Sequence, residues 1–295
     1  MQIPNTTTLA NAQATAQVGA LVTTLARMLR AEMIETHISW VLLAKDTAYK
    51  IKKPVRLPFV NYGALEARRH FCEEELRLNQ RLAPSLYLGI TRITGSQQAP
   101  VIDGPGPVLE YAVRMHRFAR GALFSEQLAA GTLRSCDVDR LAALLADFHE
   151  RAPCAEAASI FANAGPRRAA ALAALDGVRS LASEGELAEL QAWIEAEAAT
   201  LAPLWTSRKA EGRVRECHGD LHLANVVCVD GEVLAFDCIE FDPALRWIDV
   251  LDDAAFVVMD FVAHKRSDFA FRFLNAWLDR TGDHQGLPAL RFAVV

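Results

Sequence analysis

The stretch CHGDLHLANVVCVDGEVLAFD, residues 217–237, joins a dense polar cluster to two short apolar runs. An Asp-Gly pair at 230–231 separates these runs. Such a pair is the strongest short signal for a β-hairpin, because a type I′ turn requires positive φ at both central positions. A two-residue turn also fixes the register, so that Asn225 faces Phe236. The hairpin is therefore expected to bring Asn225 next to Asp237 at its open end.

Asp220 lies on the loop that leads into this end, so three oxygen-bearing side chains are expected to cluster: Asp220, Asn225 and Asp237. Amide and carboxylate oxygens are the hard ligands that Mg²⁺ prefers. In phosphoryl transfer one Asp orients the attacking hydroxyl and accepts its proton, while an Asn and a second Asp hold Mg²⁺. The spacing from Asp220 to Asn225 is that of the catalytic Asp and Asn in protein kinases. The pattern favours Asp220 as the catalytic residue and Asn225 and Asp237 as metal ligands.

Two other interpretations use the same residues. In the first, His218 and Asp220 cap a turn and Asp237 simply ends a strand. In the second, His218, Asp220 and His222 alternate and ligate Zn²⁺ in a metallohydrolase. The zinc interpretation leaves Asn225 and Asp237 without a role.

Composition limits the class of protein. A chain of 295 residues with 52% hydrophobic residues can bury one large core or two smaller ones. Its formal net charge of −5 argues against broad nucleic-acid binding, which needs a basic surface. No apolar run approaches the ~20 residues that span a bilayer, and the first residues lack a secretory signal pattern. The six cysteines show no zinc-ligand spacing, as expected for reduced residues of a cytoplasmic protein.

The first part of the chain predicts strands with one helix. Residues 1–35 begin polar and become helical, with an apolar face made of Leu21, Leu25, Met28 and Leu29. Residues 39–55 predict two short strands around Lys45 and Asp46. A helix is expected from a cap at Asn61 to about Leu82. Further strands are expected at 87–93 and 107–115, separated by a Gly- and Pro-rich connection.

The second part predicts helices interrupted by one hairpin. Alanine-rich helical sequence begins near residue 117, and residues 256–280 predict one long helix. This order of elements indicates an α+β protein with a boundary near 115–118. The chain stops inside the apolar run 287–295 without a capping signal, as a fragment of a longer protein would.

Residues HGDLHLAN (218–225) and AFDCIEFDPALRWIDVLDD (235–253) resemble the aminoglycoside phosphotransferase-like branch of the protein-kinase-like superfamily. The chain is more narrowly similar to uncharacterised bacterial members in which a P-loop kinase-like domain often follows. AYKIKKPV (48–55), FCEEELRLNQRLAPSLYLG (71–89) and EYAVRM (110–115) also fit. No P-loop motif occurs in the chain itself. The resemblance implies a two-lobed, protein-kinase-like fold.

The resemblance also implies a function for each lobe. Residues 1–115 would form a small, β-rich, nucleotide-binding N-lobe. Residues 116–295 would form a larger helical C-lobe that carries catalysis and acceptor binding, and that lobe is possibly truncated at its C-terminus.

The resemblance assigns roles to residues of the decisive stretch. Asp220 matches the catalytic Asp, Asn225 the Mg²⁺-binding Asn, and Asp237 the metal-binding Asp of the DFG position, where this chain has Asp-Cys-Ile. His218 and Asp249 are expected to brace the loop by hydrogen bonding.

The nucleotide side depends on Lys50. It lies on the second strand of the first hairpin, where a kinase-like fold places the lysine that contacts the α- and β-phosphates. The alternative is a solvated basic strand end, since Lys52 and Lys53 follow closely. Glu75 falls on the apolar face of the next helix, where a carboxylate is costly unless paired. Lys50 is therefore its predicted partner, with Glu74 as the fallback acid.

Other nucleotide contacts are less specific. No glycine-rich loop precedes Lys50, so backbone amides and hydroxyls of the turn at 36–39 would have to cover the phosphates. The strand at 110–115 resembles the one leading to the kinase hinge, so backbone groups from Ala112 to Met115 are expected to contact adenine. An ordinary core strand is the alternative. Glu240 is either an outer-shell residue or a surface carboxylate.

These expectations favour a small-molecule kinase that uses Mg²⁺ and ATP (or GTP) to phosphorylate a substrate hydroxyl. Whether an aminoglycoside is the acceptor does not follow. The alternative is a nucleotide-binding regulatory module without turnover, and a zinc metallohydrolase ranks below it. The expected partners are the nucleotide, a small hydroxylated substrate and, by resemblance, a fused P-loop kinase-like domain beyond the C-terminus, with no nucleic acid or membrane.

Overall fold

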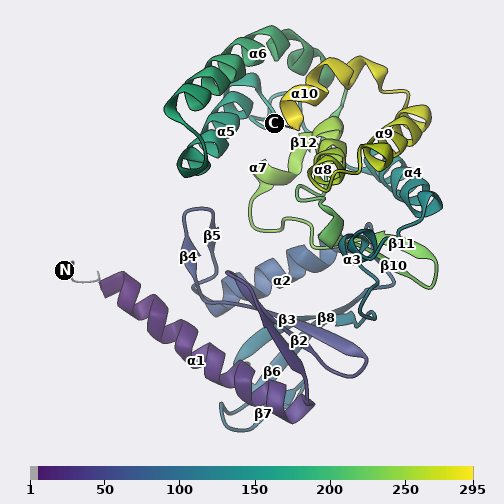
Figure 1. The fold of residues 1–295 in the computed structure, drawn as a ribbon. Helices are drawn as coiled ribbons and strands as arrows, with labels where there is room; N and C mark the ends of the chain where they lie inside the picture. Colours follow the sequence, from purple (N-terminus) through teal and green to yellow (C-terminus); the bar gives the residue numbers. More distant parts are fainter. Residues whose placement is uncertain (1–5, 295) are drawn as a thin grey trace. The chain divides into compact units, whose positions relative to one another are not determined.

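Residues 32–116 supply one antiparallel sheet in the computed structural model of the protein, which describes residues 6–294 and their side chains from residue 13 onward. Six strands pair in the order β1-β2-β3-β8-β6-β7 (Figure 1). They are β1 (Glu32–Glu35), β2 (Ser39–Leu43), β3 (Thr47–Lys52), β6 (Tyr87–Gly95), β7 (Pro100–Ile102) and β8 (Glu110–His116). A separate hairpin and two helices accompany the sheet: β4 (Arg56–Leu57), β5 (Val60–Asn61), α1 (Thr6–Leu29) and α2 (Leu65–Asn79).

Side-chain alternation assigns the two helices to opposite faces of this sheet. Ile51 of β3 lies in one apolar cluster with Leu25 of α1. Lys50 and Lys52 flank Ile51 and therefore point to the other face. There both lysines contact Glu75 of α2. The face that carries α2 is thus the one on which charged groups gather.

The remaining sequence is mostly helical. Its helices are α3 (Phe124–Ala129), α4 (Ser135–Arg151), α5 (Ala164–Gly177), α6 (Glu184–Ala210), α7 (Pro243–Arg246), α8 (Val250–Ala263), α9 (Ser267–Thr281) and α10 (Leu290–Ala293). Short 3₁₀ helices are η1 (Arg179–Leu181), η2 (Leu223–Asn225) and η3 (His284–Ala289). Two small antiparallel pairs join β9 (Val214–Glu216) to β12 (Trp247–Asp249) and β10 (Val226–Val229) to β11 (Glu232–Ala235). In the part of the chain that is described, no helix is both long and apolar enough to cross a membrane.

Backbone contacts divide the chain into two compact units. The first unit runs to Arg120 and also includes Glu240–Asp242, while the second comprises Gly121–Ile239 and the residues from Pro243 onward. The division follows Arg120, slightly beyond the boundary expected from composition. Composition gave no indication that residues 240–242 would join the first unit. The predicted α+β class is confirmed, with a β-rich first part and a helical second part.

Several predicted elements shift in position. The two strands around Lys45 and Asp46 are present as β2 and β3. Asn61 does not cap the following helix, because it belongs to the hairpin β4–β5 and its side chain accepts the Gly63 N–H. The helix begins instead at Leu65. Met28 is 56% exposed and lies outside the core, and edge strand β7 was not predicted.

The long helix expected over residues 256–280 is two helices. The chain turns between α8 and α9, and Lys265 adopts positive φ there. Each helix buries an apolar face, and Phe261 of α8 contacts Phe269 of α9 with ring centroids 5.7 Å apart. A reversal lets both apolar faces pack together, which a single straight helix would not allow.

A buried guanidinium joins three elements of the second unit. Arg208 of α6 is 2% exposed and forms paired hydrogen bonds with Asp249 and with Asp283, all between 2.6 and 2.7 Å. Burial opposes its charge, but the two carboxylates outweigh burial and raise the pKa of Arg208. Removing one member of such a network leaves buried charge uncompensated.

Replacing Arg208 with Met should therefore destabilise the protein by about 3–5 kcal/mol, because both carboxylates lose their counter-charge. Arg272→Met is the matched control, since the pair of Arg272 and Asp139 is exposed and should contribute less than about 1 kcal/mol. Urea unfolding of both variants measures the difference. Equal midpoints for the two variants would contradict the assignment.

Candidate active site

The hairpin predicted from the Asp-Gly pair is present with the expected register. Strand β10 pairs with β11 so that Val226 faces Ala235 and Val229 faces Glu232. Asp230 and Gly231 have φ of 51° and 82°, as a type I′ turn requires. The prediction of the hairpin and its register is confirmed.

Asn225 sits at the open end of this hairpin and bonds to Asp220. Its amide nitrogen donates to the backbone carbonyl of Asp220 at 2.9 Å and approaches the Asp220 carboxylate at 3.4 Å. The N–H of Phe236 donates to the Asn225 carbonyl at 2.9 Å, which places Asp237 one residue beyond the position opposite Asn225. Asp237 has φ of 66°, so the chain turns sharply as the strand ends. The structure thus brings Asp220 and Asn225 together and puts Asp237 at the same hairpin end.

His218 braces this loop from inside. The backbone N–H of Asp220 donates to its Nδ1 at 3.2 Å, so that nitrogen is an acceptor and carries no proton. Nε2 therefore holds the proton and donates to the carbonyl of Phe236 at 2.8 Å. One neutral imidazole thus ties the Asp220 loop to the end of β11. The bracing predicted for His218 is present.

The second predicted brace, Asp249, has a different position. Its carboxylate binds Arg208 and accepts the N–H of Leu251, at the start of α8. A carboxylate engaged by a buried guanidinium and a helix terminus cannot also hold the Asp220 loop. The expectation for Asp249 is corrected: it joins helices and does not brace the loop.

Two other carboxylates of α8 hold the loop. Asp253 is fully buried and accepts the N–H groups of His218 and Gly219 at 3.1 and 2.9 Å. Asp260, seven residues later on the same helical face, accepts the N–H of Leu223 at 2.7 Å, where η2 begins. The sequence analysis missed both. Asp253 sits on the apolar face of α8, so the rule applied to Glu75 would have identified it as a buried acid that needs partners.

The contacts of Asp253 also bear on the zinc interpretation. Within the described residues, one group of side chains has metal-ligand proximity: His149, Cys217 and Asp253. His149 accepts the Trp277 indole N–H at Nδ1, at 3.1 Å, and its Nε2 bonds Asp253 at 3.0 Å. Both ring nitrogens are occupied, as are those of His218. These histidines are satisfied by hydrogen bonds and do not have the free nitrogen that a zinc ligand needs.

His222 contacts the carboxylate of Asp220, with Nε2 3.5 Å from Oδ2. This contact raises the pKa of His222 above its ordinary value. Both side chains are partly exposed, at 38% for His222 and 44% for Asp220. Asp220 is therefore accessible to a substrate from solvent, unlike the buried Asp253.

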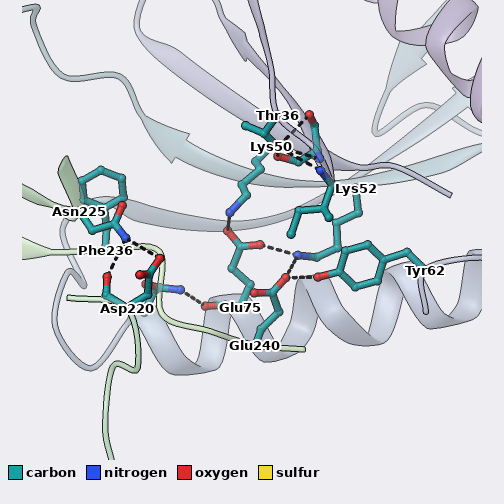
Figure 2. A network of polar contacts seen from close by, with 12 residues as sticks. Thr36, Lys50, Lys52, Tyr62, Glu75, Asp220, Asn225, Phe236 and Glu240 are labelled. Carbon is teal, nitrogen blue, oxygen red and sulfur yellow. Dashed lines mark hydrogen bonds and ion pairs between the residues drawn. The ribbon is translucent and has the colours of Figure 1, made fainter. Parts of the chain in front are cut away.

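The first unit contains the predicted ion pair. The ammonium of Lys50 lies 3.0 Å from Oε1 of Glu75, which is fully buried on α2 (Figure 2). Burial would raise the pKa of Glu75, but Lys50 and Lys52 outweigh it and lower the pKa to about 2. The fallback acid Glu74 pairs with Arg77 at the surface. The predicted pairing of Lys50 with Glu75 is confirmed, and its role toward a nucleotide stays a prediction.

The turn at 36–39 differs from the expected phosphate cover. The N–H groups of Ile38 and Ser39 donate to the hydroxyl of Thr36 at 3.3 and 2.9 Å. Lys53 braces the same turn by binding Glu35 and the Thr36 carbonyl. Two of the amides that were expected to meet phosphate are therefore engaged within the turn.

The adenine contacts expected of Ala112 and Met115 are corrected by the sheet. Strand β8 lies between β3 and β6, and both residues pair across ladders on each side. Backbone groups of a central antiparallel strand are consumed by its neighbours and cannot also bind a base. Ala112 is fully buried and Met115 is 8% exposed. Both are core-strand residues, the alternative that the sequence had left open.

Comparison with known proteins agrees with this arrangement. The family model described as the phosphotransferase enzyme family matches residues 66–292, which include the pair-forming Glu75 and the whole Asp220 loop. The chain belongs to this family. The recognition made from the sequence is confirmed at this level.

Similar proteins come from mycobacteria. The chain is 32% identical over 253 residues to uncharacterized proteins Rv2004c of Mycobacterium tuberculosis and Mb2027c of Mycobacterium bovis, covering 84% of this chain. It spans 49% of each, about half the length of these relatives.

Solved structures with likeness include an aminoglycoside-3'-phosphotransferase of type VIII (17% identity, TM-score 0.48, covering 93% of this chain and 97% of that chain). A choline/ethanolamine kinase family protein from Mesorhizobium loti is similar at 12% identity, with TM-score 0.47, covering 93% of this chain and 83% of that chain.

Burial of His218 predicts a pH-dependent stability. Burial lowers the pKa of His218, outweighing the nearby carboxylate of Asp253. The unfolded chain then binds the proton more readily, so this stabilisation is full above the unfolded pKa of about 6.5 and is lost as pH falls below it. The unfolding free energy of wild type minus that of His218→Gln, measured in urea, should fall between pH 7.5 and 5. Parallel pH curves for the two proteins would contradict this.

Proposed function

We propose that this chain is a Mg²⁺-dependent small-molecule kinase that transfers the γ-phosphoryl group of ATP (or GTP) to a substrate hydroxyl. The observation that carries the proposal is the bonded pair of Asp220 and Asn225 at the hairpin end that also bears Asp237. Membership of the phosphotransferase family supports the class of reaction. The relatives are about twice as long, so the proposal concerns the part that this chain represents.

Asp220 is assigned the role of catalytic base. Its carboxylate is partly exposed while its backbone is held by His218 and Asn225. A carboxylate that is fixed yet accessible is suited to orient a hydroxyl and to accept its proton as the oxygen attacks phosphorus.

The donor set fits Mg²⁺. Asn225 uses its amide nitrogen in the bond to Asp220, and this leaves the amide oxygen pointing elsewhere as a hard ligand. Asp237 adds a carboxylate at the same hairpin end. When bound, the ion would supply positive charge that draws the phosphate groups in and offsets charge on the transferred group. Asn225 and Asp237 are the residues assigned to hold it.

Lys50 is assigned to the phosphates of the nucleotide. Its side chain is 12% exposed, so the ammonium is fixed by Glu75 without being fully enclosed. Adenine contacts are assigned to the segment after β8, from residue 117 to 120, because the strand itself has no backbone groups to spare.

Replacing Asp220 tests the assignment directly. Asp220→Asn should lower acceptor-dependent ATP consumption at least about 100-fold, because the amide cannot accept the hydroxyl proton. Affinity for Mg·ATP, measured by calorimetry, should remain close to that of wild type.

Asp230→Asn is the matched control, since Asp230 is exposed at the hairpin tip and Asn tolerates positive φ. It should leave turnover unchanged. Unchanged turnover in Asp220→Asn would rule out the catalytic role. Nucleotide binding with no turnover on any hydroxylated acceptor would instead favour a regulatory module.

Metal dependence separates the kinase from the zinc hydrolase. Chelation with EDTA should abolish turnover, and Mg²⁺ should restore it because the assigned ligands are an amide and carboxylates. Metal analysis of the purified protein should find no stoichiometric zinc. Tightly bound zinc that restores activity alone would overturn the magnesium assignment.

A further inference from the structure

A second lysine is buried beside the pair of Lys50 and Glu75. Lys52 is 1% exposed, and its ammonium lies 2.7 Å from Oε2 of Glu75. Lys50 contacts the other oxygen, Oε1, at 3.0 Å. One buried carboxylate therefore faces two ammonium groups. Burying the second positive charge requires a second counter-charge.

Glu240 supplies this charge. Lys52 donates to Oε1 of Glu240, and the hydroxyl of Tyr62 donates to the same oxygen (Figure 2). The Lys52 ammonium also lies 5.0 Å from the centre of the Tyr62 ring. Two lysines and two glutamates thus form a chain of contacts with no net charge, Lys50–Glu75–Lys52–Glu240, closed by Tyr62.

The protonation states agree with this description. Burial alone would lower the pKa of Lys52, but the carboxylates of Glu240 and Glu75 outweigh it and raise the pKa. Burial and the Glu240 carboxylate both raise the pKa of Tyr62, so its hydroxyl keeps the proton that it donates. The cluster therefore holds its charges near neutral pH.

Glu240 reaches the cluster from an unexpected part of the chain. It follows Asp237 by three residues, yet residues 240–242 belong to the first unit. Phe241 adds a second anchor by packing on Phe59, with ring centroids 5.6 Å apart. The segment that continues from Asp237 is therefore fastened to the unit that carries Lys50.

We propose that Glu240 is a positioning residue for Lys50: it neutralises Lys52, so that Glu75 keeps one oxygen for Lys50. The inference rests on the proposed function, which assigns Lys50 to the nucleotide phosphates. Without the charge of Glu240, Lys52 retains Glu75 as its carboxylate partner and competes with Lys50 for it. Lys50 then loses its fixed position.

Competition between the lysines can be tested without nucleotide. Acetic anhydride labelling followed by peptide mass spectrometry measures the reactivity of Lys50, with the exposed Lys45 as internal reference. Glu240→Gln should increase labelling of Lys50. Lys52→Met/Glu240→Gln removes both charges together and should return labelling to the wild-type value. Glu74→Gln, which removes a carboxylate of the same helix outside the cluster, should have no effect.

Nucleotide binding provides the second measurement. Calorimetric titration with Mg²⁺ and adenylyl imidodiphosphate should show that Glu240→Gln weakens binding about tenfold, the scale of one charge-assisted hydrogen bond. The charge-balanced double variant should bind like wild type, and Glu74→Gln should also do so. The double variant keeps the test valid even where Glu240→Gln folds poorly, since a buried pair can often be replaced by neutral groups.

The outcomes separate the two claims. If wild type binds no nucleotide while Lys50 labelling responds as expected, the proposed function is wrong and the positioning by Glu240 stands. If wild type binds and Lys50→Met weakens binding, but Glu240→Gln changes neither measurement, the inference is overturned and the kinase assignment stands. Failure of the double variant to restore either property would also overturn it, since a purely structural role does not depend on charge balance.

Discussion

The two-residue turn at Asp230 and Gly231 is the constraint on which the chemistry of the second unit depends. It sets the ladder from Val229 to Val226, and with it the residue that stands opposite Asn225. Side chains alternate faces along a strand, so a slip of one residue would turn Asp237 away from the hairpin end. A local backbone requirement, positive φ at two positions, thus decides which distant side chains can act together.

Buried acids provide the rigidity around this hairpin. His218 and Gly219 are held through their amides by Asp253, while Asp260 holds the start of η2. Charge-assisted bonds from backbone amides are strong in a buried setting, and they fix the main chain while the Asp220 side chain remains accessible. The same principle operates in the first unit, where Glu75 is enclosed and fully paired.

The sequence predicted what depends on local signals. The hairpin followed from turn chemistry, and the pair of Lys50 and Glu75 followed from a charge on an apolar helical face. The family resemblance is confirmed by the family model. Residues were misplaced where long-range pairing decides.

Three of these residues show the reason. A strand looks the same in sequence whether its backbone is free or bonded on both sides, so Ala112 gave no sign of its central position. Asp249 and Asp253 lie four residues apart, and only the position of Arg208 shows which carboxylate is already engaged. Glu240 follows Asp237 closely, and nothing in its surroundings along the chain predicts that Lys52 would bury it.

Helix α8 acts as a ruler along the Asp220 loop, since Asp253 and Asp260 are spaced by nearly two full turns. Adding or deleting one residue between them would rotate one carboxylate by about 100° around the axis and detach it from its amide. Substitutions in this interval can be absorbed, whereas changes of length cannot. Among related chains, natural variation between these two acids should therefore consist of exchanges of side chains and not of insertions or deletions.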